Sequence, residues 1–138
     1  MIRRGAGVIA ALALSATGVC QAEDSGAWPP EIRSHLNDSF LRCRQDAHAV
    51  RPIEHCYAEE ITLQRWSLDQ LVKTRLAQAA TPADAETFRQ EQGAWSDAVD
   101  KRCTPPADRR GSIWAQVAQQ CFLDAVIRRR IALEPPRP

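Results

Sequence analysis

The sequence predicts an all-α protein, a small four-helix bundle built from two helical hairpins that disulfides hold together. Apolar residues recur at spacings of three and four in four segments, which is the pattern of a buried helix face. No segment alternates between apolar and polar residues over the length of a strand, so we expect no sheet. Prolines fall between the four segments, where they mark the turns.

The first two predicted helices form the first hairpin. One begins after Pro30 and the other near Pro52, because proline is tolerated at a helix start and disrupts a helix interior. The apolar stripe of the first helix consists of Ile32, Leu36, Phe40, Cys43 and Ala47. The stripe of the second consists of Ile53, Tyr57, Ile61, Leu68, Leu71, Val72, Leu76 and Ala79. Both stripes are expected to face a common core.

The other two predicted helices form the second hairpin. Thr81 can cap the third helix, Pro82 suits its first turn, and Asp84 faces the positive end of the helix dipole. The stripe of this helix consists of Phe88, Gln92, Trp95, Val99 and Cys103. The fourth helix is expected to start after Gly111, with Ser112 as its cap. Its stripe consists of Trp114, Val117, Cys121, Ala125, Arg128 and Ile131.

The N-terminal segment has the features of a secretory signal. A pair of arginines precedes an apolar run, and Ala22 ends an acceptable cleavage site. We therefore expect residues 1–22 to be removed and residues 23–138 to form a single domain, in the periplasm or secreted. Lipidation of Cys20 is an alternative, but the residues before it fit a lipoprotein signal poorly.

Charge and hydropathy argue against two classes of partner. The chain has 18 basic and 17 acidic residues, a formal charge of +1. Removing Arg3 and Arg4 with the signal leaves 16 basic against 17 acidic residues, a charge of −1. A near-neutral surface does not favour nucleic acid, and outside the signal no apolar stretch approaches the roughly 20 residues that span a bilayer. We expect no nucleic-acid partner and no transmembrane span in the mature form.

Four cysteines remain after removal of the signal, and export favours their pairing as disulfides. Of the three possible pairings, we favour Cys43 with Cys56 and Cys103 with Cys121, because each pair flanks one predicted turn. A zinc site made of the first pair with His48 and His55 is an alternative. Its ligand spacing is irregular, so we predict no metal site.

The sequence contains no pattern that indicates an enzyme. No serine of the mature chain lies in a G-x-S-x-G turn, and no H-E-x-x-H occurs. Glu59 and Glu60 could suggest the paired carboxylates of a glycosidase, but adjacent helical residues point about 100° apart. We interpret this pair as a solvated helix face, and expect neither catalysis nor a cofactor.

Two blocks in the second half of the chain resemble a known family. The first has the pattern Q-x-x-W…D-x-x-C and consists of Gln92, Trp95, Asp100 and Cys103. The second has the pattern G-S…C…R…L and consists of Gly111, Ser112, Cys121, Arg129 and Leu133. In order and spacing they resemble the lysozyme inhibitor LprI N-terminal domain family, with the resemblance extending from Cys43 to Leu133. It implies a periplasmic or secreted helical module, and lysozyme binding for some members.

The matched residues are expected to be structural rather than catalytic. Arg129 is expected to form an ion pair across helices, with Asp100 as the partner. Trp95 and Trp114 lie on predicted stripes and are expected in the core. Trp66 lies off the stripe of its helix and Trp28 precedes the first helix, so each is a candidate for surface contact.

The most prominent exposed element is the predicted loop of residues 104–111. Two prolines restrict it, and a disulfide would hold both of its flanks, so it would lose little entropy on binding. Asp108, Arg109 and Arg110 are its candidate binding residues, because guanidinium groups pair with carboxylates such as the two in a lysozyme cleft. A solvated charged turn is the alternative.

These observations predict a non-enzymatic binding protein. With the family resemblance, the expected partner is a protein, and a lysozyme whose cleft it occludes is the leading candidate. The alternative is a structural or adaptor module of the cell envelope that binds another periplasmic protein or a cell-wall fragment.

Overall fold

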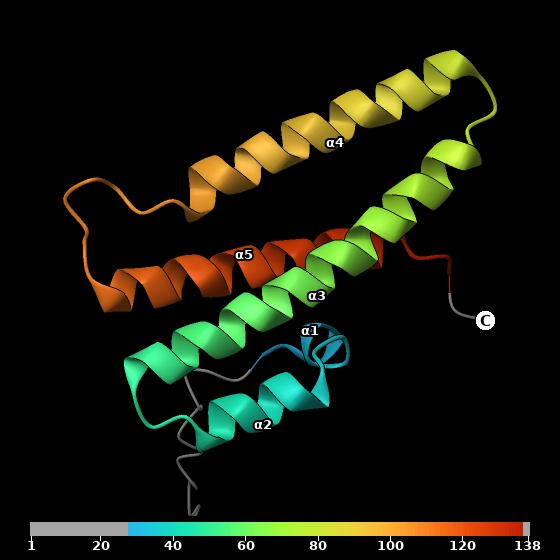
Figure 1. Ribbon diagram of the computed structural model, residues 1–138. Helices are drawn as coiled ribbons and strands as arrows, with labels where there is room; N and C mark the ends of the chain where they lie inside the picture. Colours follow the sequence, from blue (N-terminus) through green and yellow to red (C-terminus); the bar gives the residue numbers. More distant parts are fainter. Residues whose placement is uncertain (1–27, 137–138) are drawn as a thin grey trace, which may run out of the picture.

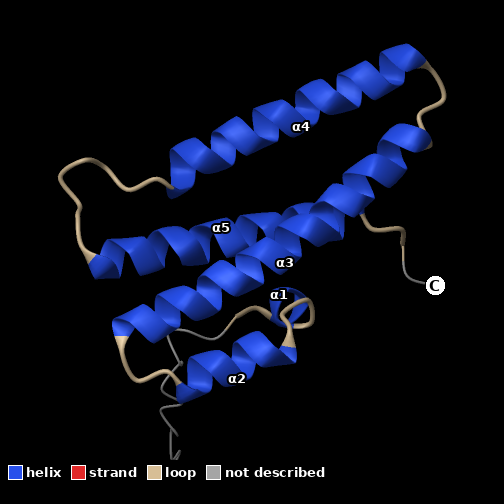
Figure 2. Cartoon of the chain, viewed as in Figure 1, coloured by secondary structure: helices blue, strands red, loops and turns tan. Residues whose placement is uncertain are grey.

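The computed structural model describes residues 28–136, and this part of the chain is helical, without strands (Figure 1, Figure 2). Its helices are α1 (Pro30–Arg33), α2 (Asp38–Asp46), α3 (Val50–Ala77), α4 (Pro82–Cys103) and α5 (Ser112–Leu133). The all-α prediction is confirmed. The predicted signal peptide, residues 1–22, and Cys20 lie outside the described residues. Within the described range, no helix has the length and apolar character to span a membrane.

The long helices α3 and α5 form the centre of the molecule. They pack against each other, α2 lies along one side of α3, and α4 lies on the other side, where it contacts both α3 and α5 (Figure 1). The short helix α1 packs against α5. The arrangement is a bundle of two hairpins, α2 with α3 and α4 with α5.

Both predicted disulfides are present, and they join the two hairpins as expected. Cys43 pairs with Cys56 between α2 and α3, and Cys103 pairs with Cys121 between α4 and α5. The paired Cα atoms are 5.8 and 5.4 Å apart, within the ordinary range for a disulfide. The first pair is therefore not available as thiolate ligands for zinc.

The predicted first helix is divided into two helices in the structure. The break falls at residues 34–37, between α1 and α2. Ser34 Oγ donates a hydrogen bond to the Glu31 carbonyl oxygen at the end of α1 (3.0 Å). At the start of α2, the Asn37 backbone N–H donates to Glu60 on α3 (3.0 Å). The apolar stripe stays buried across the break, in a core cluster that includes Ile32, Leu36 and Phe40.

One of the two predicted helix caps is correct. At α4, Thr81 Oγ1 accepts a hydrogen bond from the Asp84 backbone N–H (3.1 Å), and Pro82 lies in the first turn. At α5 the cap residue is Gly111, with φ of 106°, and Ser112 is the first residue inside the helix. Glycine fits this position because a positive φ is strained for residues that carry a Cβ.

The buried face of α5 differs from the predicted stripe. Val117 is 51% exposed, and Arg128 is also exposed. The buried residues of this helix are Leu123, Ala125, Val126, Ile127 and Leu133. They cover a broad face because α5 contacts α1, α3 and α4 rather than a single neighbour.

Two of the four tryptophans lie nearer to the surface than predicted. Trp95 and Trp114 are partly buried, and Trp95 packs at the edge of two core clusters. Trp66 is 64% exposed, as its position off the stripe predicted. Trp28 is partly buried and packs against the core beside α1.

Candidate binding surface

Glu60 of α3 is a buried carboxylate, only 1% exposed. The prediction of a solvated face is correct for Glu59, which is exposed, and wrong for Glu60. Three N–H groups donate to the Glu60 carboxylate: the Asn37 backbone (3.0 Å), the Asn37 side-chain amide (2.8 Å) and the Gln64 side-chain amide (2.7 Å). These donors replace water, and so allow a carboxylate to be buried.

Gln64, also 1% exposed, extends this polar network to α5. Its amide group donates to the His35 carbonyl oxygen (2.6 Å), and its Oε1 accepts a hydrogen bond from the Arg130 guanidinium. The same guanidinium lies 3.5 Å from one carboxylate oxygen of Glu134, and the His35 imidazole lies 3.0 Å from the other. The network therefore fixes the α1–α2 turn, α3 and the end of α5 relative to one another.

Tyr57 holds α2 against α3 beside the first disulfide. Arg44 donates a hydrogen bond to the phenol oxygen (2.6 Å), and Phe40 meets the ring edge-on with 5.3 Å between centroids. Burial raises the pKa of the Tyr57 phenol above its ordinary value of 10.0, and the Arg44 cation opposes this with a smaller effect. The phenol is therefore neutral at physiological pH and acts as a structural group.

Three of the residues that carry the family resemblance meet between α4 and α5. Arg129 Nε donates a hydrogen bond to the Gln92 side-chain oxygen (2.6 Å), and the Arg129 guanidinium lies 5.8 Å from the centre of the Trp95 ring. The expected partner, Asp100, is exposed instead. The contact across helices is thus made to an amide and an aromatic ring, and it joins α4 to α5.

The remaining matched residues serve the ends of α5 and the second disulfide. Gly111 and Ser112 begin the helix, and Leu133, which is 8% exposed, packs into the core at its end. Cys103 and Cys121 form the disulfide between α4 and α5. These positions hold the second hairpin together, and they place the loop between its helices.

The loop between α4 and α5, residues 104–111, projects past the ends of both helices (Figure 1). All three candidate binding residues, Asp108, Arg109 and Arg110, are exposed there. Because the second disulfide joins the two helices that flank the loop, its ends are fixed on the bundle. The loop thus presents two cations on a constrained support.

Contacts within the loop order both arginines. The Arg109 backbone N–H donates to the Pro106 carbonyl oxygen (2.9 Å), and Arg110 Nε donates to the Ala107 carbonyl oxygen (3.0 Å). The Arg109 guanidinium lies 4.7 Å from the centre of the Trp114 ring, a cation–π distance. Both guanidinium groups are therefore oriented before any partner binds.

Two exposed aliphatic side chains follow directly after the loop. Ile113 is 67% exposed and Val117 is 51% exposed, and their spacing of four residues places them on one face of α5. The predicted apolar stripe of this helix includes Val117, which is in fact exposed, and does not include Ile113. Both residues precede Cys121, through which the disulfide joins α5 to α4. Their position before this link could have indicated that no neighbouring helix covers the start of α5. We call Arg109, Arg110, Ile113, Trp114 and Val117 the loop–α5 surface.

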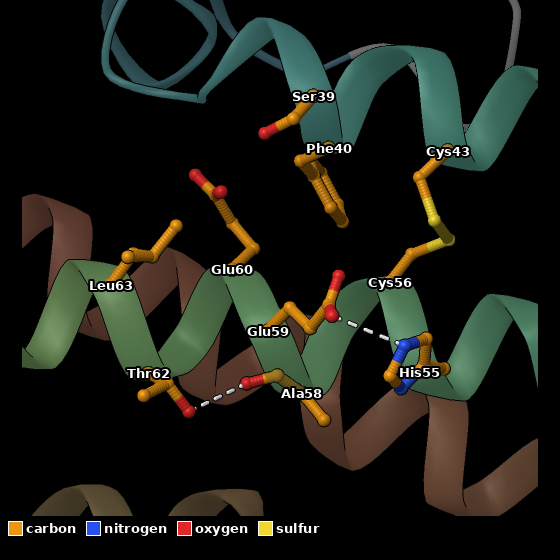
Figure 3. Close-up of a pocket in the computed structure, with 10 residues that line it drawn as sticks. All are labelled: Ser39, Phe40, Cys43, His55, Cys56, Ala58, Glu59, Glu60, Thr62 and Leu63. Carbon is orange, nitrogen blue, oxygen red and sulfur yellow. Dashed lines mark hydrogen bonds and ion pairs between the residues drawn. A yellow bond between two sulfur atoms is a disulfide. The ribbon is translucent and has the colours of Figure 1, made fainter.

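An open groove of about 570 Å³ lies between α2 and α3, with the first disulfide in its wall (Figure 3). His55 Nε2 and a Glu59 carboxylate oxygen are 3.1 Å apart at its edge. Leu63, which lines the groove, is 50% exposed, and Trp66 on the next turn of α3 is 64% exposed. The groove is a second apolar surface, on different helices from the loop–α5 surface.

The fold and these contacts define a class: a disulfide-linked helical bundle whose buried ionisable groups join helices and whose loop and adjoining helix end are exposed. The chain belongs to the family described as lysozyme inhibitor LprI, whose model matches residues 43–133, more than half of the 138-residue chain. The family is described by inhibition and not by a catalysed reaction. Comparison with curated proteins and with solved structures finds no match. Paired cysteines are typical of proteins outside the cytoplasm.

Proposed function

We propose that this chain is an exported, non-enzymatic inhibitor that binds a lysozyme and occludes its cleft with residues 104–111. Family membership supports the inhibitor class. The observation that carries the proposal is the exposed pair Arg109 and Arg110, on a loop whose flanking helices are joined by a disulfide. The partner is then the enzyme, and the inhibitor needs no cofactor.

The chemistry of the two surfaces is complementary. A lysozyme cleft contains the two carboxylates that perform glycoside hydrolysis. A guanidinium group can donate two parallel hydrogen bonds to a carboxylate, and it stays charged at any physiological pH. Because Arg109 already lies over Trp114, it loses less conformational entropy on binding than a free side chain would. A loop that occupies the cleft blocks entry of the polysaccharide sterically.

Replacing both loop arginines, Arg109→Ala with Arg110→Ala, is expected to weaken lysozyme inhibition by about 30-fold or more. Each arginine that anchors an interface contributes about 1 kcal/mol or more, which together gives this factor. The measurement is the inhibition constant for lysis of a peptidoglycan suspension, determined for several lysozymes with oxidised protein. The wild type should inhibit at least one of them.

A matched control removes the same charge elsewhere. Arg51→Ala with Arg89→Ala alters exposed positions on α3 and α4, and the exposed pair of Arg89 with Glu86 (2.8 Å) contributes little to stability. This control should inhibit like the wild type. Equal weakening by both double variants would indicate a general charge effect and contradict the role of the loop. A wild type that inhibits no lysozyme would contradict the function itself.

The groove between α2 and α3 favours a second candidate, an envelope adaptor. Leu63 lines the groove and Trp66 lies on the next turn of α3; both are exposed, and occlusion of a cleft by the loop makes no use of them. Complexes isolated from the periplasm under oxidising conditions separate the two functions. A partner that is not a lysozyme, and that is lost with Leu63→Ser plus Trp66→Ser, would favour the adaptor.

A further inference from the structure

We infer that Ile113 and Val117 are the apolar anchors of the lysozyme-binding surface and set the lifetime of the complex, whereas Arg109 and Arg110 set its rate of formation. This inference rests on the proposed function and extends its site from the loop onto α5. The partner surface it requires is an anionic cleft with an apolar wall. A lysozyme cleft contains two carboxylates, and ligand clefts are lined mostly by apolar and aromatic side chains.

The turn at Gly111 brings the cations and the apolar side chains together. Its φ of 106° directs the chain from the loop into α5, and its carbonyl oxygen accepts the Trp114 backbone N–H at 3.1 Å. The Arg109 guanidinium then lies over the Trp114 ring, beside the helix turn that carries Ile113. Positive charge and apolar surface are thus adjacent at one end of the molecule.

The exposure of the two aliphatic side chains is the second observation. Among the described residues, five large apolar side chains are exposed: Val50, Leu63, Trp66, Ile113 and Val117. The two on α5 are those that lie on its first two turns, directly after the loop. Covering such side chains removes apolar area from water, and this stabilises a complex in proportion to the area covered. The fold itself gains little from them at these positions.

The charge of the loop–α5 surface indicates which partner it binds. In the loop, Arg109 and Arg110 outnumber Asp108, so the surface is cationic and complements an anionic cleft. A second copy of this chain, docked symmetrically, would bring two cationic loops together, which is unfavourable. The observations therefore favour the enzyme over self-association.

The two kinds of contact act on different rate constants. Exposed charges attract a partner of opposite charge over a distance of about 10 Å at ordinary salt, so they raise the association rate. Apolar contacts form only when the surfaces touch, so they lower the dissociation rate. A kinetic measurement can therefore detect whether the loop sets the association rate and α5 sets the dissociation rate.

The test measures association and dissociation rates, at two salt concentrations, for a lysozyme that the wild type inhibits. Ile113→Ser with Val117→Ser should raise the dissociation rate about tenfold or more and change the association rate by less than about twofold. Arg109→Ala with Arg110→Ala should lower the association rate and reduce its dependence on salt.

The control is matched in exposure. Leu63→Ser with Trp66→Ser alters side chains that are 50% and 64% exposed, against 51% and 67% for Val117 and Ile113. It should bind like the wild type. Where thermal melting shows that the serine pair at α5 perturbs the fold, Ile113→Thr with Val117→Thr keeps the branched shape and gives the same test.

A dissociation rate unchanged by either α5 variant overturns the inference and leaves the proposed function standing. An equal increase in the control overturns it as well, because the apolar contact would then lie at the α2–α3 groove. Inhibition by the wild type is measured first. If the wild type inhibits no lysozyme, that result contradicts the proposed function and, with it, this inference.

Discussion

Replacing Glu60 by alanine is expected to lower the free energy of unfolding by about 3 kcal/mol, one of the largest effects of any single substitution in this chain. The change leaves the Asn37 backbone N–H, the Asn37 amide and the Gln64 amide without their common acceptor. Unfolding in urea, followed by circular dichroism, measures the loss. Because the network ties α3 to the α1–α2 turn and to α5, the loss should be cooperative across the bundle.

Glu59 provides the control within the same turn of α3. It is exposed, and its contact with His55 (3.1 Å) lies at the surface, so Glu59→Ala should change the free energy of unfolding by about 0.5 kcal/mol at most. Glu60→Gln, which keeps the volume and one acceptor oxygen, should fall between the two. Equal losses at Glu59 and Glu60 would contradict the buried network.

Removing the second disulfide, with Cys103→Ala and Cys121→Ala, is expected to cost about 3 kcal/mol of stability and most of the lysozyme inhibition. The stability is lost because the unfolded chain is no longer constrained across 18 residues. The inhibition is lost because α5, which carries one end of the loop, is no longer tied to the end of α4, so the loop must be ordered on binding. Urea unfolding and the inhibition constant, both measured on folded protein, report the two losses separately.

The first disulfide is the matched control. It closes 13 residues between α2 and α3, so Cys43→Ala with Cys56→Ala should cost a similar amount of stability. It does not flank the loop, so inhibition should stay close to that of the wild type at a temperature where the protein is folded. Loss of inhibition in both variants, or in neither, would contradict the role assigned to the second disulfide.

Most features of the fold that depend on local sequence agree with the prediction, the exception being the cap of α5, which is Gly111 rather than Ser112. Thr81 and Asp84 form a cap within one turn, and each cysteine pair flanks one connection, so both features depend on neighbours along the chain. The apolar stripes of the first three predicted helices also agree with the buried faces, because helix faces repeat at a fixed interval along the chain.

The other errors arise where distant residues decide the structure. The stripe of Ile32, Leu36 and Phe40 keeps its phase across the break at residues 34–37, so periodicity alone predicts one continuous helix. The contact that holds the break comes from Glu60, 23 residues from Asn37. Packing of α5 against several neighbours likewise widens its buried face beyond a single stripe.

The candidate site was predicted in part. The exposed loop arginines follow from the prolines and charges around them, which are visible in the sequence. The placement of Arg109 over Trp114, and the exposure of Val117, depend on the turn at Gly111 and on where α4 ends. These are properties of the assembled hairpin.

Competition for the cleft tests the central claim most directly. The dissociation constant of the oxidised protein for a lysozyme it inhibits is measured by calorimetry, with the cleft empty and with the cleft occupied by a saturating peptidoglycan oligosaccharide. If loop residues 104–111 enter the cleft, the apparent dissociation constant rises in proportion to the oligosaccharide concentration. A dissociation constant that the oligosaccharide leaves unchanged would place the contact elsewhere on the enzyme and contradict the account.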